Sequence, residues 1–260
     1  MDEFSKVGFT VKESQRQDTC ADHGEFTSRG FSFGRNVRWM GCPECAAIKK
    51  SADDLAAAVK EAEDAQRRLE SRMNQSGIPL RYRTKDFASY VADTDGKEKA
   101  RAVAMEFASN IKSHSEKGTV MVFSGQPGTG KSHLAIAIAQ SVMHQRTVLY
   151  ISAIDAVRMI RNTWRRDSEQ TETQVLDMLT GIGLLVLDEV GVQYGTEAEQ
   201  VTLFDIIDKR YRDLMPMILL TNQNKGGMKT FLGDRSFDRL REGGIWVTFD
   251  WSSQRSGVSA

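Results

Sequence analysis

The stretch Gly125-Gln126-Pro127-Gly128-Thr129-Gly130-Lys131-Ser132 decides the fold. It matches the pattern G-x-x-x-x-G-K-[ST], in which glycines let successive backbone N–H groups turn toward phosphate oxygens. Residues 119–124 before it have the composition of a buried strand, and residues 131–144 after it are typical of a helix. The helix N-terminus adds a favourable dipole. Together with His133, the stretch therefore predicts a cradle for ATP.

Within this cradle, two side chains have predicted roles. Lys131 is expected to reach the β- and γ-phosphates, and Ser132 to hold Mg²⁺. A second motif follows at 182–189, where an apolar run ends in two acids. Asp188 suits the Mg²⁺ shell, and Glu189 is placed to accept a proton from the attacking water. These residues predict an ATPase.

Another polar residue follows the predicted strand 217–221. In this setting Asn222 resembles a sensor-1 residue, which orients the water or senses the γ-phosphate. Short continuous apolar runs that alternate with amphipathic segments indicate a parallel sheet covered by helices. The predicted fold class is α/β with a five-stranded parallel sheet. Its strands are expected at 119–124, 147–152, 183–187, 217–221 and 245–249, and its helices at 97–112, 131–144, 153–165, 197–213 and 235–241.

Composition excludes several other classes of protein. The chain has 260 residues, with 35 Lys+Arg against 35 Asp+Glu, so its net charge is zero and a histone-like nucleic-acid coat is excluded. Its 3 cysteines are too few for a disulfide framework. No secretory signal or run of about 18 apolar residues is visible, so we expect a cytoplasmic protein without membrane contact.

All three cysteines lie in the first 50 residues, a segment too small to build a sufficient core unaided. Cys20-x₂-His23 and Cys42-x₂-Cys45 have the spacing of paired zinc ligands. We predict a structural Zn²⁺ site closed by these four side chains. Reduced, unliganded thiols are the alternative interpretation.

An abrupt change to Ala-, Glu- and Arg-rich sequence indicates a helix from Ser51 to about Asn74. Its expected start at Ser51 rests on the following acids Asp53 and Asp54. Gly77 and Pro79 end the pattern. The predicted domains are a zinc-binding module at 1–50, a connecting helix at 51–76 and an ATPase domain at 77–260. Two interpretations of the helix stay open, a solvated connector and a surface that docks on a partner.

A basic cluster follows the second predicted strand of the sheet. Arg158, Arg161, Arg165 and Arg166 surround Trp164. A basic helix with an aromatic side chain can follow a phosphate backbone and stack a base, so single-stranded DNA is one candidate ligand. A charged, solvated helix is the other interpretation.

The chain resembles the AAA+ ATPases of the DnaC-type helicase loaders, and close behind them the DnaI-type loaders and the IstB-type transposition helpers. The resemblance runs from about residue 77 to the C-terminus. Besides the motifs above, it rests on Phe237-Asp238-Arg239-Leu240-Arg241 and Phe249-Asp250-Trp251-Ser252-Ser253-Gln254-Arg255-Ser256, which generic P-loop proteins lack.

The resemblance implies further catalytic roles. Arg239 falls at the arginine-finger position, which reaches the γ-phosphate of a neighbouring subunit, and Arg235 assists it. Arg255 matches the sensor-2 arginine. Because the finger acts in trans, self-association through the AAA+ domain is implied, and the isolated chain is expected to be a weak ATPase.

The resemblance also implies a function in replication initiation: binding of a hexameric DnaB-type replicative helicase and its ATP-dependent delivery to single-stranded DNA. The zinc module is similar to the module with which DnaI-type loaders grip the helicase. Two alternatives stay open, an IstB-type transposition helper whose partner is a transposase, and a nucleotide-gated adaptor for which ATP binding matters more than turnover.

Overall fold

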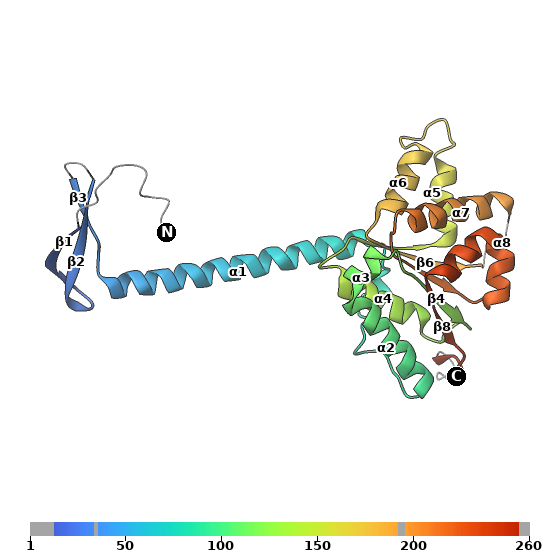
Figure 1. Ribbon diagram of the computed structural model, residues 1–260, viewed down its shortest axis with the longest axis horizontal. Coiled ribbons are helices and arrows are strands. Elements are labelled where there is room, and N and C mark those ends of the chain that lie inside the picture. The colour runs from blue at the N-terminus through green and yellow to red at the C-terminus, as the bar shows by residue number, and fades with distance from the viewer. Residues whose placement is uncertain (1–12, 34–35, 192–195, 255–260) are drawn as a thin grey trace. The chain divides into compact units, whose positions relative to one another are not determined.

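The computed structural model describes residues 13–33, 36–191 and 196–254. The chain divides into two compact units, with the boundary between Arg67 and Arg68 inside the long helix α1 (Pro43–Gln75) (Figure 1). The smaller unit contains an antiparallel sheet, and the larger unit contains a parallel sheet with its covering helices. Each unit has its own candidate site.

The small sheet has the strand order β1-β2-β3. Its strands are β1 (Glu13–Cys20), β2 (Gly24–Phe33) and β3 (Asn36–Trp39). Cys20 pairs with Gly24 across the β1–β2 turn, where Gly24 adopts a φ of 78° that favours glycine. Sequence analysis missed these strands because six of the eight β1 side chains are exposed, so β1 carries no apolar alternation.

Helix α1 begins at Pro43, so the predicted start at Ser51 is wrong. Proline is favoured at the first helical position because its missing N–H would have no partner there. The carbonyl of the preceding Cys42 accepts the first helical hydrogen bond from Ala46 N, at 3.0 Å. Ser51 lies inside the helix, and its hydroxyl donates to the Ile48 carbonyl at 2.8 Å.

The larger unit is built on a five-stranded sheet with the order β5-β6-β7-β4-β8, in which every neighbouring pair is parallel. This confirms the predicted sheet. Because the strands are parallel, the C-terminal ends of the central strands meet at one edge. The strands are β4 (Val120–Gly125), β5 (Val148–Ser152), β6 (Leu184–Val190), β7 (Met217–Thr221) and β8 (Gly244–Phe249).

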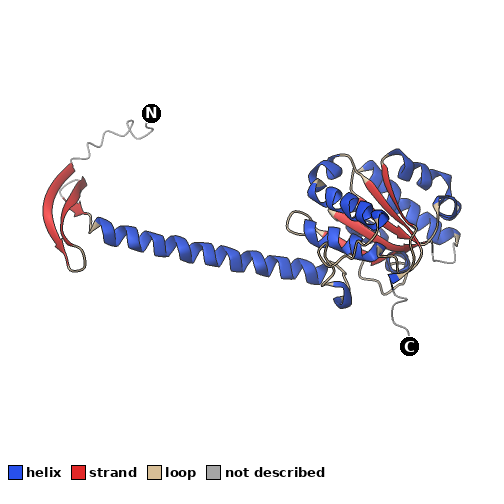
Figure 2. Cartoon of the chain, turned by 90° about the horizontal axis from the view of Figure 1, so that it is seen from below, coloured by secondary structure: helices blue, strands red, loops and turns tan. Residues whose placement is uncertain are grey.

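Helices cover both faces of this sheet (Figure 2). α2 and α4 pack together on one face, and α5, α6, α7 and α8 form the other layer. The helices are α2 (Asp95–Ser109), α3 (Ile111–Glu116), α4 (Lys131–Val142), α5 (Ala153–Asn162), α6 (Glu172–Gly181), α7 (Glu197–Arg212) and α8 (Lys225–Glu242). Within the described residues, none of the helices is long and apolar enough to cross a membrane.

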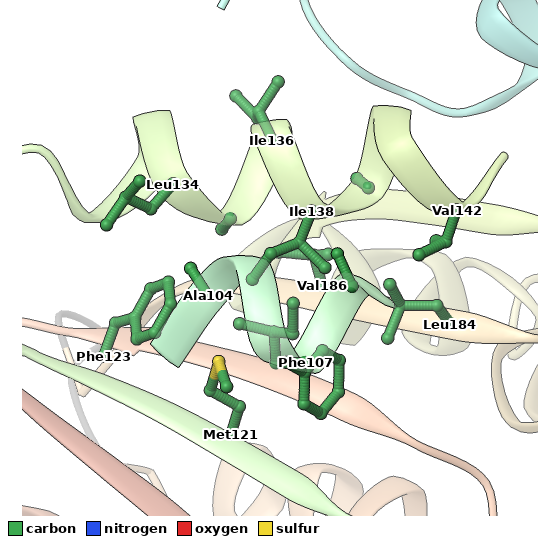
Figure 3. Close-up of a cluster of buried hydrophobic side chains, with 14 of the residues drawn as sticks. Ala104, Phe107, Met121, Phe123, Leu134, Ile136, Ile138, Val142, Leu184 and Val186 are labelled. Atoms are coloured by element: carbon green, nitrogen blue, oxygen red, sulfur yellow. The ribbon is translucent and has the colours of Figure 1, made fainter. Parts of the chain in front are cut away.

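Alternate residues of the strands enter opposite cores. Met121 and Phe123 of β4 pack with Phe107 of α2 and Ile138 of α4 (Figure 3), whereas Val122 belongs to the core on the other face. A strand buried on both faces carries an unbroken apolar run, which is why the sequence revealed these strands.

Several helices of the larger unit differ from the predictions. The helix predicted at 97–112 covers most of α2 and the start of α3. α5 ends at Asn162, so residues 163–165 lie beyond it. α6 was not predicted, although Thr171 and Gln174 form a capping box at its start. α8 begins ten residues earlier than predicted, since the predicted helix 235–241 is only the part after Gly233, whose φ of 76° interrupts the helix. Glycine is well suited to that kink.

Candidate functional site

A cleft of about 440 Å³ lies at the C-terminal ends of β4, β6 and β7. Its lining comes from five parts of the chain: residues 81–85 before α2, the glycine-rich loop with the start of α4, the two acids of β6, the end of β7 with the residue after it, and one residue after β8. The lining side chains and backbone belong to Arg81, Tyr82, Thr84, Lys85, Pro127, Gly128, Gly130, Lys131, Ser132, His133, Asp188, Glu189, Leu220, Thr221, Asn222 and Gln254. Sequence analysis predicted the glycine-rich loop, the two acids and Asn222 as nucleotide-site residues, but it did not predict residues 81–85.

The loop between β4 and α4 has the curl that a phosphate cradle needs. Gly128 and Gly130 adopt φ values of 83° and 99°. A Cβ atom on Gly130 would lie 2.8 Å from the ring of Tyr90, so a side chain is excluded there on two grounds. Thr129 closes the turn by donating its hydroxyl to the Gln126 carbonyl at 2.8 Å. The loop therefore points backbone N–H groups of the α4 N-terminus into the cleft.

Lys131 is buried at the start of α4, and three acceptors hold its amine. Its Nζ donates to the carbonyls of Gly125 and Gln126 at 2.6 and 2.9 Å, and to Oδ1 of Asn222 at 2.9 Å. Asn222 follows β7, the direct neighbour of β4. The lysine and the predicted sensor residue are therefore in contact.

The two acids near the end of β6, Asp188 and Glu189, differ in their surroundings. Asp188 accepts hydrogen bonds from Ser132 Oγ at 3.3 Å, from the Glu189 backbone N–H at 2.7 Å, and from the hydroxyl of Tyr150. Glu189 is exposed and adopts a φ of 60°, which is uncommon for a residue with a Cβ. Ser132 and Asp188 thus converge as a magnesium site requires. Sequence analysis missed Tyr150. Its strand, β5, is mostly apolar, and the sequence does not show that the Tyr150 hydroxyl faces Asp188 on the neighbouring strand β6.

The α4 helix also holds the segment that lines the far part of the cleft. His133 Nε2 lies 2.8 Å from the carbonyl oxygen of Asp86. Two turns further along α4, the Gln140 amide donates to the carbonyls of Arg83 and Lys85, both at 3.1 Å. His133 and Gln140 are seven residues apart and so lie on one face of α4; this spacing is the sequence signal that could have indicated the contact with residues 83–86.

Residues after β8 support the same loop. The indole N–H of Trp251 donates to the Thr129 carbonyl at 2.8 Å, and the Gln254 backbone N–H donates to the Gly128 carbonyl at 3.0 Å. Arg255, the predicted sensor-2 arginine, lies outside the described residues.

Arg239 does not line the cleft of its own chain. Its Nε lies 2.5 Å from Oδ1 of Asp208, and its guanidinium stacks over the Tyr211 ring at 4.8 Å. Arg235 is exposed on the same helix, after the kink. The contacts with Asp208 and Tyr211 therefore fix the orientation of the Arg239 guanidinium, the predicted arginine finger.

The predicted DNA-binding residues are all exposed, but they do not form one helix. Arg158 and Arg161 lie on α5, whereas Trp164, Arg165 and Arg166 follow its end. The Trp164 indole donates to Glu172 at 2.7 Å. Acids already pair with two of the arginines: Asp155 with Arg158 at 3.1 Å, and Asp167 with Arg165 at 3.3 Å. The expectation of a continuous basic helix is wrong.

In the smaller unit, Cys20, His23, Cys42 and Cys45 form one cluster, with ligand atoms all within 4.8 Å of one another. The β1–β2 turn supplies the first pair, and the start of α1 supplies the second. His23 Nδ1 lies 3.6, 3.7 and 3.3 Å from the three sulfur atoms, and two sulfurs are 3.5 Å apart. A tetrahedral zinc site has edges of about 3.6 Å for N···S and about 3.8 Å for S···S. The cluster fits this metal.

The electrostatics of the cluster suit a cation. The backbone N–H of Asp22, followed by His23, lowers the pKa of the Cys20 thiol to about 6. The hydrogen bond between the Cys45 and Cys20 thiols raises the pKa of Cys45 to about 12, with burial and the charge of Cys20 adding to the effect. A bound metal ion would instead favour the thiolate form of both. The carboxylate of Glu44 lies 3.7 Å from His23 Nε2, where an outer partner can orient the ring.

Comparison with known proteins agrees with this nucleotide-site geometry. The family described as "IstB-like ATP binding protein" matches residues 47–240. This chain belongs to that family. The match includes the residues that line the cleft apart from Gln254, and it excludes the four residues of the Cys20–His23–Cys42–Cys45 cluster.

Curated proteins and solved structures also resemble this chain. The "Replicative helicase loader DnaC" of Escherichia coli strain K12 is 36% identical over 222 residues, which cover 83% of this chain and 87% of the relative. "Uncharacterized protein YdaV" of the same strain is 37% identical over 195 residues, or 74% and 77%. A crystal structure of the DnaC helicase loader superimposes with a TM-score of 0.59 at 20% identity, covering 65% of this chain and 99% of that one, which supports the fold.

Proposed function

We propose that this protein is an ATP-dependent loader that binds a hexameric DnaB-type replicative helicase and delivers it to single-stranded DNA during replication initiation. The observation that carries the proposal is the similarity to DnaC helicase loaders over 87% of their length. The cleft supports it, because the residues that would bind and hydrolyse ATP converge there. We place this activity in the cytoplasm.

In this proposal, each residue of the cleft has a separate task. The loop N–H groups and Lys131 bind the phosphates, and Ser132 and Asp188 would hold Mg²⁺, which neutralises phosphate charge. Glu189 accepts the proton of the attacking water, and Asn222 orients that water through its fixed amide. His133, which lines the cleft as predicted for a nucleotide-binding residue, also supports the cleft wall through the Asp86 carbonyl.

Assembly completes the proposed site. Arg239, with Arg235 beside it, would reach the nucleotide of an adjacent copy, and Arg255 would contact the nucleotide of its own chain. Because Arg239 does not line its own cleft, the isolated chain should hydrolyse ATP slowly. Hydrolysis would then depend on self-association around the helicase and DNA.

The N-terminal residues form the proposed partner-binding part. A structural Zn²⁺ held by Cys20, His23, Cys42 and Cys45 would join the small sheet to the start of α1. Along α1, Ile48, Leu55 and Val59 are more than half exposed, at 59%, 68% and 52%. Such an apolar surface on a helix suits contact with another protein. We keep 1–50, 51–76 and 77–260 as functional divisions, and all four metal-binding residues lie in the first of them.

The proposal is tested by mixing the full chain with purified DnaB-type helicases and ATP, followed by native mass spectrometry and a loading assay on circular single-stranded DNA. We expect a discrete complex and loaded helicase. Glu189→Gln should bind ATP and helicase but fail to recycle, whereas the exposed control Glu169→Gln should behave as wild type. Full recycling by Glu189→Gln would instead favour a nucleotide-gated adaptor.

The family description favours one second candidate, an IstB-type transposition helper. Adding a transposase to the same binding experiment distinguishes this candidate from the helicase loader. Binding of transposase without any binding of helicase would reject the loader and support the helper.

A further inference from the structure

Tyr150 lies on β5 beside the acid-bearing strand β6, with Tyr150 paired to Val186 and Ser152 paired to Asp188. Its ring is 8% exposed and belongs to the core beneath α4. Its hydroxyl donates to Oδ2 of Asp188, a residue that lines the cleft. The ring of Tyr150 is thus buried, while its hydroxyl contacts one carboxylate oxygen of Asp188.

That oxygen also faces Ser132, whose Oγ lies 3.3 Å away, while the other oxygen of Asp188 accepts the Glu189 N–H at 2.7 Å. Three donors on a single carboxylate leave it one orientation. Of the three, only the Tyr150 hydroxyl comes from outside both nucleotide motifs. The backbone of Tyr150 is also fixed, because its N–H donates to the Ser76 carbonyl at 2.7 Å.

We propose that Tyr150 is a positioning residue of the nucleotide site: its hydroxyl fixes the Asp188 carboxylate in the orientation in which Asp188 and Ser132 meet at the Mg²⁺ ion of bound ATP. This inference rests on the proposed ATPase function. Groups that orient metal ligands from behind contribute about 10–100-fold to metal affinity.

The test compares the affinity for a fluorescent, non-hydrolysable ATP analogue in Mn²⁺ and in EDTA. Tyr150→Phe keeps the ring and the backbone bond to Ser76. We expect its Kd in Mn²⁺ to rise about 10–100-fold and its Kd in EDTA to stay unchanged. Tyr150→Met is a second variant without the hydroxyl, should the first fail to fold.

Tyr90→Phe is the matched control. Tyr90 is also buried beside the glycine-rich loop, but its hydroxyl has no hydrogen-bond partner among the described residues, so both Kd values should match wild type. An unchanged Kd in Mn²⁺ for Tyr150→Phe would overturn the inference, as would an equal loss in Mn²⁺ and in EDTA. Absence of binding by the wild type would instead overturn the proposed function.

Discussion

The Nζ atom of Lys131 and the Oδ1 atom of Asn222 lie 2.9 Å apart, across the ends of the neighbouring strands β4 and β7. The amine is also held by two loop carbonyls, which do not depend on Asn222. Asn222→Ala should therefore leave ATP affinity within about threefold but lower the hydrolysis rate of the assembled protein about 10²-fold. Lys131→Ala should abolish ATP binding. Calorimetry and a phosphate-release assay measure the two quantities.

Asn224→Ala provides the control for Asn222. It lies two residues along, and its side chain caps α8 by accepting from Gly227 N at 2.8 Å. This substitution should cost about 1 kcal/mol of stability and leave hydrolysis unchanged. Equal hydrolysis rates for Asn222→Ala and Asn224→Ala would reject the role of Asn222.

Arg239 should act on a neighbouring copy. Arg239→Ala alone should lower assembly-dependent hydrolysis by about 10³-fold, with little effect on ATP binding. Lys131→Ala should be equally inactive. Mixing the two inactive variants should restore part of the activity, because an intact cleft from one meets an intact arginine from the other. Phosphate release in the mixture measures this.

Arg241→Ala, an exposed arginine on the same helix, is the control and should retain wild-type hydrolysis. If the mixture stays as inactive as its components while mixed assemblies form, the arginine acts within its own chain.

The Cys20–His23–Cys42–Cys45 cluster should bind about one Zn²⁺ per chain. Because the metal would connect the small sheet to α1, its removal by a chelator should unfold residues of this unit and leave the parallel-sheet unit intact. Colorimetric zinc release and hydrogen exchange measure the two effects. His23→Ala should lower zinc affinity at least ~10-fold. The exposed His144→Ala should not change it, and stoichiometric zinc in a Cys20/Cys45 double Ser variant would contradict the ligand set.

The exposed arginines around Trp164 should contribute to DNA affinity through phosphate contacts. Arg161→Ala combined with Arg165→Ala should weaken single-stranded DNA binding and reduce the salt dependence of the Kd by about 1–2 charges. Fluorescence anisotropy over a series of salt concentrations measures both. A double Lys49/Lys50 Ala variant removes the same charge elsewhere and should bind normally. An unchanged Kd for the arginine variant would exclude the site.

Much of the larger unit could be predicted because its signals are local. The glycine-rich loop and the buried strands depend on residue type at fixed spacing. Tyr150 and Gln140 could not be found this way, since their importance depends on which strand or segment lies beside them. The small unit shows the same limit: the ligand spacing predicted the cluster, yet the Pro43 start of α1 was missed because Ser51 and its acids resemble a helix start equally well.

The support that Trp251 and Gln254 give to the carbonyls of Thr129 and Gly128 has a consequence for biosynthesis. These partners are separated by more than a hundred positions, so the ribosome makes the loop long before it makes the residues that brace it. Strand β8, the neighbour of β4, also arrives late. A nascent chain that stops short of β8 therefore carries every residue of the glycine-rich motif without these supporting contacts, and we expect tight ATP binding only after synthesis has passed Gln254.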